Sequence, residues 1–246
     1  MDYVWFLLGL LVLTGLTVTV GRLAGIGVGF LPLWAIARAV VQLSAIALLL
    51  RGILVAPWSV VAFLALMLST ASWTAGGRLR ELHHGRRVAV TGVLSGALVS
   101  LAVVFGLRLV DLDVVHLVAV AGIVIGNAMT AATLSGRNFL RTSLERRGEI
   151  EAMFALGASP SLAHEDIGRE ATREALLPNL DQARSTGLVT LPGAFVGALF
   201  GGASPVEAAQ FQLVVLAAIG LAMMVVGIVV TRLAGRAPYS PPAVSR

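Results

Sequence analysis

The sequence predicts an all-α integral membrane protein with about seven transmembrane helices and one helical insert exposed to water. Three observations support this fold class. Hydrophobic residues make up 57% of the 246 residues and charged residues only 13%, a composition typical of membrane chains. The apolar residues form long uninterrupted stretches. A single long segment, residues 135–184, breaks this pattern with eight acidic residues and seven arginines.

Seven apolar stretches are candidates to cross the roughly 30 Å hydrocarbon core of a bilayer. The first lacks a basic start and a small-residue cleavage site, so we expect a retained helix and not a signal peptide. The sixth is short and is interrupted at Pro192-Gly193. In order, the stretches are residues 3–20, 32–50, 57–75, 88–107, 114–134, 185–200 and 208–233.

The charged insert carries signals for two short helices. Residues 142–145 (Thr-Ser-Leu-Glu) have the spacing of a capping box, which predicts a helix start. Gly157 can adopt the left-handed conformation that ends a helix. Ser159-Pro160 predicts a new start, because serine caps free N–H groups and proline needs none at the first position. We expect this second helix to end at Pro178.

The arginines predict the orientation in the membrane. Fifteen of the eighteen fall in the insert, in the connections after the first and third spans, or in the C-terminal tail. With seven spans, all of these segments lie on one side of the membrane. By the positive-inside rule, the side that carries the excess of arginines is cytoplasmic. The sequence therefore predicts an N-terminus outside, a C-terminus inside, and a cytoplasmic insert.

Missing residue types exclude several function classes. The chain contains no cysteine, which excludes disulfides and thiolate metal sites, and all its basic residues apart from histidine are arginines. Without lysine it has neither a Walker A loop nor Schiff-base chemistry. We therefore expect a chain without its own ATPase motif. The spans also lack a convincing Ser/His pair or His-Glu metal motif, so we do not expect an enzyme. The high pI of about 11.1 reflects arginines on one membrane face, so no nucleic-acid partner is expected.

A set of short motifs resembles a known transporter family. Glu151-Ala152 followed by Leu156-Gly157-Ala158 resembles the "EAA" coupling loop of ABC permeases. The wider pattern is similar to the FetB/YbbM-type ABC permeases, which include iron exporters and plant aluminium-tolerance relatives. One departure is Phe195, where that family has methionine after Leu-Pro-Gly. The other matching motifs are residues 126–130, 175–178, 187–189, 191–193, 201–202 and 204–205, with Gln212, Arg38 and Gln42-Leu43.

The resemblance implies one permease domain over residues 1–246, in a bacterial inner membrane, with the coupling segment 135–184. It implies export of iron or another metal ion, a homodimer of permeases, and a separate cytoplasmic ABC ATPase that binds ATP and Mg. No cofactor is expected in this chain itself. Two alternatives stay open, an ABC permease for a non-metal substrate such as a nucleotide sugar, and a secondary transporter without ATPase.

The first helix of the insert is the expected contact with the ATPase. Its apolar residues recur at helical spacing and form one face, which we expect to insert into a groove of the motor, while Glu149 or Glu151 pairs with motor arginines. The alternative is a surface helix that packs on its own bundle. The coupling residues are Glu149, Ile150, Glu151, Met153, Phe154, Leu156 and Gly157.

Polar residues within the spans are candidates for the translocation path. Arg38 and Gln42 lie one turn apart on one helix face, and an ionisable residue in a span faces protein or water. The alternative for Arg38 is that it snorkels to the interface. Asn127 and Thr130 either line the path or form interhelical hydrogen bonds beside a Gly122/Gly126 pair.

The sixth span contains a predicted break. Pro192 lacks an N–H group and Gly193 allows bending, while Thr190 adds a polar side chain. Within the membrane, an interrupted helix is tolerated only where its free backbone groups face protein or water. We expect either a hinge that lines the path or a kink that serves packing only.

Asp111, Asp113 and His116 form a candidate cluster of metal ligands. Carboxylate and imidazole groups suit divalent transition metals. The three residues lie in the predicted outer connection between the fourth and fifth spans. They are candidates for capture or release of a metal ion, and the alternative is a solvated turn.

Overall fold

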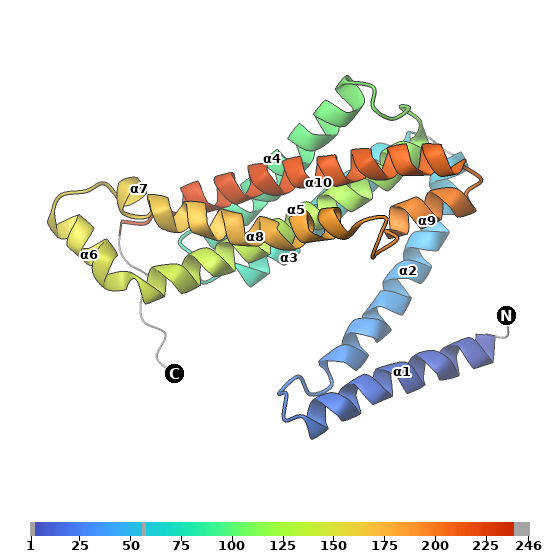
Figure 1. The fold of residues 1–246 in the computed structure, drawn as a ribbon, viewed down its shortest axis with the longest axis horizontal. Helices are drawn as coiled ribbons and strands as arrows, with labels where there is room; N and C mark the ends of the chain where they lie inside the picture. Colours follow the sequence, from blue (N-terminus) through green and yellow to red (C-terminus); the bar gives the residue numbers. More distant parts are fainter. Residues whose placement is uncertain (1–2, 56–57, 239–246) are drawn as a thin grey trace. The chain divides into compact units, whose positions relative to one another are not determined.

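The computed structural model describes residues 3–55 and 58–238, which fold into ten helices and form two units, residues 1–59 and 60–246 (Figure 1). The first unit is a hairpin of α1 (Tyr3–Leu23) and α2 (Leu31–Val55), joined by a turn in which Gly25 and Gly29 have positive φ angles. The described side chains of both helices are mostly apolar and exposed, as expected for helices that face lipid.

The second unit contains the other eight helices of the described residues. Long helices α5 and α10 form its centre, and α4 and α8 pack against them. The bounds are α3 Ser59–Arg78, α4 Gly85–Gly106, α5 Val114–Glu145, α6 Arg147–Ala155, α7 Pro160–Ala163, α8 Glu165–Ser185, α9 Gly193–Phe200 and α10 Pro205–Ala234.

Six of the described helices are long and apolar enough to cross a membrane: α1, α2, α3, α4, α5 and α10. The expectation of an all-helical membrane protein is confirmed. The first five predicted spans and the last each fall largely on one of these helices, although α5 extends eleven residues beyond the predicted end at Leu134. The predicted third span also included Pro57, which lies outside the described residues.

The predicted sixth span, residues 185–200, is not one helix. α8 ends at Ser185, residues 186–192 form an irregular connection, and only Gly193–Phe200 is helical. Gly187 has a φ of 92°, and its N–H bonds to the Thr190 carbonyl at 2.8 Å, so the chain turns here. α9 would span only about 12 Å. The chain therefore runs from the α6–α7 end of the unit to the start of α10 through α8, this connection and α9 in succession (Figure 1).

Close packing between α4 and α10 depends on two glycines. A Cβ on Gly96 would lie 2.6 Å from the backbone oxygen of Ala222 and 2.3 Å from a Val226 methyl group. A Cβ on Gly92 would lie 2.5 Å from a Val230 methyl group. Small residues allow membrane helices to approach this closely, and van der Waals contact then holds them together.

α8 continues through Pro178, where the sequence predicted a helix end. Proline removes one backbone hydrogen bond, but here the helix packs along both α5 and α10. Ala171, Thr172, Ala175 and Leu176 are buried just before the proline and Asn179 just after it. Tertiary packing on both sides therefore holds the helix together across a residue that would interrupt it in isolation.

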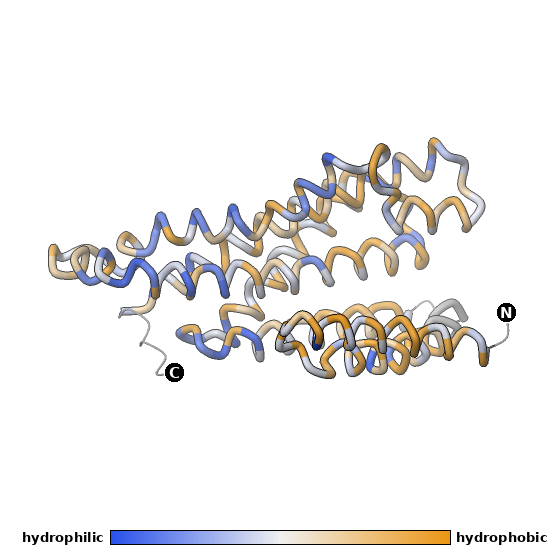
Figure 2. Tube along the Cα trace, turned by 60° about the horizontal axis from the view of Figure 1, so that its bottom comes forward, coloured by the Kyte–Doolittle hydropathy of each residue, from blue (hydrophilic) through white to orange (hydrophobic). Residues whose placement is uncertain are grey.

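The basic segments of the second unit gather at one end. The turn between α3 and α4, the last residues of α10, and His164 between α7 and α8 line a common cavity of about 320 Å³ with Phe139 of α5. Figure 2 shows hydrophilic residues concentrated toward this end and hydrophobic residues along the rest of the unit. The structure thus gathers the arginine-rich connections that the sequence placed on one membrane side.

Candidate functional site

The α6–α7 hairpin is built on an extension of α5. The capping-box residues Thr142 and Ser143 are buried within α5, which runs without interruption to Glu145, so the predicted helix start there is wrong. The chain instead bends at Arg146, which follows α5 and precedes α6. The failure has a simple cause, because the hydroxyl groups face the bundle and are not placed at a helix end.

The turn between α6 and α7 follows the sequence prediction. Gly157 has a φ of 84°, in the left-handed region, and the Ala158 N–H bonds back to the Met153 carbonyl at 3.0 Å. Ser159 accepts a hydrogen bond from the Leu162 N–H at 3.3 Å, with Pro160 at the start of α7. The turn is therefore fixed by glycine, serine and proline, each with its expected role.

The apolar face of α6 points into the chain's own bundle. Ile150 is only 1% exposed, and Phe154 is half-buried, with its ring 5.9 Å from that of His164. Met153 lines the groove between α6 and α7. The expectation that Ile150, Met153 and Phe154 together enter a partner is therefore corrected, because the bundle already covers Ile150 and part of Phe154.

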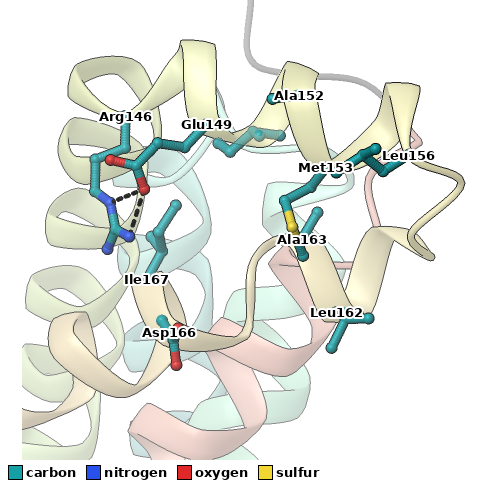
Figure 3. A pocket seen from close by; sticks show the side chains of 10 residues that line it. Arg146, Glu149, Ala152, Met153, Leu156, Leu162, Ala163, Asp166 and Ile167 are labelled. Atoms are coloured by element: carbon teal, nitrogen blue, oxygen red, sulfur yellow. Dashed lines mark hydrogen bonds and ion pairs between the residues drawn. The ribbon is translucent and has the colours of Figure 1, made fainter.

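Two leucines point outward instead. Leu156 is 85% exposed and Leu162 is 53% exposed. They lie on either side of a groove of about 360 Å³, which Figure 3 shows between α6 and the segment from α7 to α8. The groove is lined by Arg146, Glu149, Ile150, Ala152, Met153, Leu156, Leu162, Ala163, Asp166 and Ile167. The two exposed leucines beside this groove make the hairpin a candidate protein-binding surface.

The acidic residues of α6 have partners within the helix. Arg146 donates to Glu149 at 2.6 and 2.8 Å, and Arg147 donates to Glu151 at 2.7 Å. The hydrogen bonds that Arg146 donates to the Glu149 carboxylate raise the pKa of Arg146. Because these pairs are solvent-exposed, each contributes at most about 1 kcal/mol and can exchange for a partner's charge at little cost.

His164 joins the hairpin to the bundle, a role that the sequence did not suggest. It is 2% exposed, and its Nδ1 lies 2.8 Å from the Pro160 carbonyl oxygen. Its ring stacks on Phe139 of α5 at 5.6 Å, and a Cβ on Gly235, just after α10, would lie 3.1 Å from its own Cβ. One side chain thus contacts α5, α6 and the end of α10.

Replacing His164 by alanine should loosen the hairpin. The substitution removes a buried ring and one hydrogen bond, for a loss of about 2–4 kcal/mol of local stability. We expect trypsin to cleave after Arg146, Arg147 and Arg169 faster than in the parent protein. His164→Phe keeps the ring contacts and should stay closer to the parent rate. Equal cleavage rates in the parent and in His164→Ala would contradict this role.

The candidate path residues of α5 bond within their own helix. The Asn127 amide donates to the Ile123 carbonyl at 2.8 Å, and the Thr130 hydroxyl donates to the Gly126 carbonyl at 3.0 Å. Thr130 and Gly126 are exposed, and no atom lies within 4 Å of a Cβ on Gly126. These residues therefore lie on an open face of the second unit.

Arg38 and Gln42 both lie on α2 of the first unit and both are exposed. One helical turn separates them, so they share a face as the sequence predicted. Their assignment to a path stays a prediction.

Pro192 starts a helix and does not kink one. It is the N-terminal cap residue of α9, with Gly193 as the first helical residue. Thr190 belongs to the irregular connection and forms an isolated bridge with Thr186. The side-chain oxygen of Gln212 on α10 accepts the Phe195 N–H at 3.1 Å, which satisfies one free donor of α9. The helix is therefore interrupted at Pro192 as predicted, but the proline stands at the start of a new helix and not at a kink within one.

Asp113 and His116 form a helix cap. Asp113 precedes α5 and accepts the His116 N–H at 2.9 Å, and the His116 ring also contacts its carboxylate. The backbone hydrogen bond, followed by that of the ring, lowers the pKa of Asp113. Among residues 3–55 and 58–238, no three His, Asp or Glu side chains group as metal ligands would. The solvated-turn alternative accounts for this pair.

Loss of this cap should be measurable. Asp113→Ala is expected to lower the free energy of unfolding by about 1 kcal/mol, and Asp113→Asn, which still accepts the N–H, by less. Because the carboxylate pKa is lowered by folding, its contribution is complete above the ordinary pKa of 3.8 and is lost as the pH falls through the lower folded value. Thermal unfolding in detergent at several pH values checks this. A difference that grows toward acid would contradict the assignment.

Charged residues near the end of α8 were placed in the cytoplasmic insert by the sequence. Arg184 donates to Asp181 at 3.3 Å, and both side chains are exposed. They lie on a helix packed along apolar α10, so they are not part of the hairpin. In the sequence, Asp181 and Arg184 continue the charged insert. Only the packing of α8 against α10 shows that they belong to the bundle.

Comparison with known proteins gives consistent matches along most of the chain. The model of the family described as "Uncharacterised protein family (UPF0014)" matches residues 4–239. "UPF0014 membrane protein STAR2" of Oryza sativa subsp. japonica is 38% identical over 75% of this chain and 65% of the relative. This chain therefore spans slightly less than two thirds of the rice relative's length.

Two further relatives carry functional names. "Protein ALUMINUM SENSITIVE 3" of Arabidopsis thaliana is 33% identical over 75% of this chain and 68% of the relative. "Probable iron export permease protein FetB" of Escherichia coli (strain K12) is 30% identical over 74% of this chain and 71% of the relative. No solved structure matches the chain.

Proposed function

This chain belongs to the UPF0014 family of membrane proteins, and from this premise we propose that it is the permease subunit of an ABC transporter driven by a separate ATPase. The observation that carries the proposal is the α6–α7 hairpin. It is a folded, charged element with an exposed apolar rim at the arginine-rich end of a bundle whose long helices suit lipid. A surface of this kind fits a partner protein outside the bilayer.

The positive-inside rule supports a cytoplasmic hairpin, with the N-terminus outside and the C-terminus inside. Two copies of the chain would enclose the path, and two ATPase subunits, holding ATP and Mg, would bind the hairpins. Leu156 and Leu162 are the apolar contacts, and Glu149 and Glu151 exchange their partners on α6 for arginines of the motor. ATP-driven movement of the motors would then alternate access to the two sides of the membrane.

Iron or another metal ion is the proposed substrate. Its support is the name of the Escherichia coli relative, which is 30% identical over 74% of this chain. Export follows from the same name.

Transport by inverted membrane vesicles tests the proposal. Vesicles containing this chain and its ATPase should accumulate ferrous iron only with hydrolysable ATP, and vesicles with the ATPase alone should not. A Leu156→Cys variant, carrying the sole cysteine of the chain, should cross-link to the ATPase. Iron uptake driven by an ion gradient without an ATPase would instead establish a secondary transporter. ATP-driven transport of another solute, with no response to iron, would keep the ABC assignment and replace the substrate.

A further inference from the structure

We propose that one face of α8, together with the adjoining face of α5, borders a water-filled cavity at the depth of the hydrocarbon core. The face consists of Glu174, Asp181, Gln182 and Arg184 on α8 and Thr130 on α5, and we call it the α8 polar face. The proposal extends the transporter assignment by locating polar surface inside the membrane, but its physical argument needs only the packing of α8 against α5 and α10.

The depth of α8 follows from its contacts with α10. A Cβ on Gly227 of α10 would lie 2.6 Å from a Thr172 methyl group, and a Cβ on Gly220 would lie 3.9 Å from the Asn179 amide nitrogen. The residue number thus rises along α8 as it falls along α10, so the two helices are antiparallel and in close register. Figure 1 shows α8 lying beside α10 in this way.

α10 locates the middle of the membrane. Between Glu207 and Arg232 it contains no charged residue, a stretch of about 36 Å at 1.5 Å per residue. Gly220 lies midway along this stretch, and Asn179 packs against it. Asp181 and Arg184 follow Asn179 on α8, within about 8 Å along the helix axis. Both side chains therefore lie well inside a hydrocarbon core about 30 Å thick.

The second unit does not cover these charges. The side chains of Asp181 and Arg184 are 67% and 77% exposed, although they pair with each other. Ionisable groups at this depth avoid lipid and face protein or water-filled cavities. The chain also places the irregular residues 186–192 directly after them, and exposed non-helical backbone has the same requirement.

The exposed faces of α5 and α8 adjoin. Arg141 of α5 donates to Glu174 of α8 at 2.8 Å, and both side chains are partly exposed, so this pair marks where the two faces meet. Thr130 lies about three helical turns before Arg141, and Asp181 lies about two turns after Glu174. Each therefore shares a face with a member of the bridging pair.

The composition of the face favours water as its occupant. Each carboxylate is paired with an arginine, Glu174 with Arg141 and Asp181 with Arg184. A second copy of the chain that covered this face would have to desolvate both pairs, which is costly. Hydrated ions or other small polar solutes can pass such a charge-balanced surface without an unpaired charge to hold them.

Cysteine labelling tests the proposal directly, because the natural chain has no cysteine. Single-cysteine variants at Asp181, Gln182, Arg184 and Thr130 are treated in membranes with a membrane-impermeant methanethiosulfonate reagent. Leu213→Cys is the matched control, since Leu213 is 65% exposed on α10 at a similar level. We expect rapid labelling of the four face positions and little labelling of the control. Gln182→Cys removes no charge, so it remains informative if a charge variant fails to fold.

Two outcomes would overturn the proposal. The face variants could react as slowly as Leu213→Cys, which would mean that lipid or protein covers the face. They could also form disulfides between two copies while resisting the reagent, which would identify a dry interface. Labelling requires neither ATP nor transport, so failure of the ABC assignment would leave the expected labelling pattern unchanged.

Discussion

We expect replacement of Leu156 by aspartate to abolish the stimulation of the proposed partner ATPase while leaving membrane insertion intact. Leu156 is 85% exposed at the rim of the hairpin groove, so the substitution should disturb little of the folded chain. A leucine buried in an interface contributes about 2 kcal/mol, and a carboxylate in its place adds a desolvation cost. Affinity for the ATPase should fall by about 100-fold or more.

The measurement is ATP hydrolysis by the reconstituted complex, with pull-down of the ATPase as a second readout. Leu112→Asp is the matched control, because Leu112 is 75% exposed in the connection between α4 and α5, at the other end of the second unit. It should behave as the parent does. Full stimulation by Leu156→Asp would remove the hairpin rim from the coupling surface, and an equal loss in the control would indicate a general effect of the new charge.

Replacing Gly96 by alanine should strongly destabilise the second unit. The new methyl group would lie 2.6 Å from the Ala222 carbonyl oxygen, and this backbone atom can move away only if α4 and α10 separate. Overpacking of this kind costs about 1–3 kcal/mol. Gly92→Ala should cost less, because its nearest neighbour is a Val230 methyl group that can rotate.

Thermal unfolding in detergent, followed by circular dichroism, measures both effects. Gly126→Ala is the control, since nothing lies within 4 Å of a Cβ at that position in α5. It should be neutral or slightly stabilising, because alanine favours helices by up to about 1 kcal/mol over glycine. A Gly96→Ala protein as stable as the Gly126→Ala protein would show that the helices do not approach as closely as described.

Six of the seven predicted spans could be identified from the sequence because length and hydropathy determine them, whereas residues 185–200 do not form one helix. The turn at Gly157 and Ser159 could be predicted because glycine and serine act there through local backbone geometry. Pro178 was assigned as a helix end by the same local rules, and this failed because α5 and α10 hold α8 from both sides. Local signals therefore succeeded where local forces dominate and failed where long-range packing does.

In the candidate site, too, local features could be predicted from the sequence and long-range contacts could not. Helical periodicity correctly grouped Ile150 and Phe154 on one face, but it could not tell whether that face meets the chain's own bundle or a partner. The burial of Ile150 depends on where α6 lands after the bend at Arg146. His164 was missed because two of its partners, Phe139 on α5 and Gly235 after α10, lie outside the hairpin in the sequence.

The unbroken course of α5 has a mechanical consequence. Its 32 residues form one continuous rod from the cap at Asp113 to the bend at Arg146, and His164 clamps the hairpin to its last turns. A rod without an internal joint transmits force by rocking as a whole. A displacement of the hairpin would then swing the far end in the opposite sense, and the non-helical residues 186–192 are where the chain between α8 and α9 could bend to follow it.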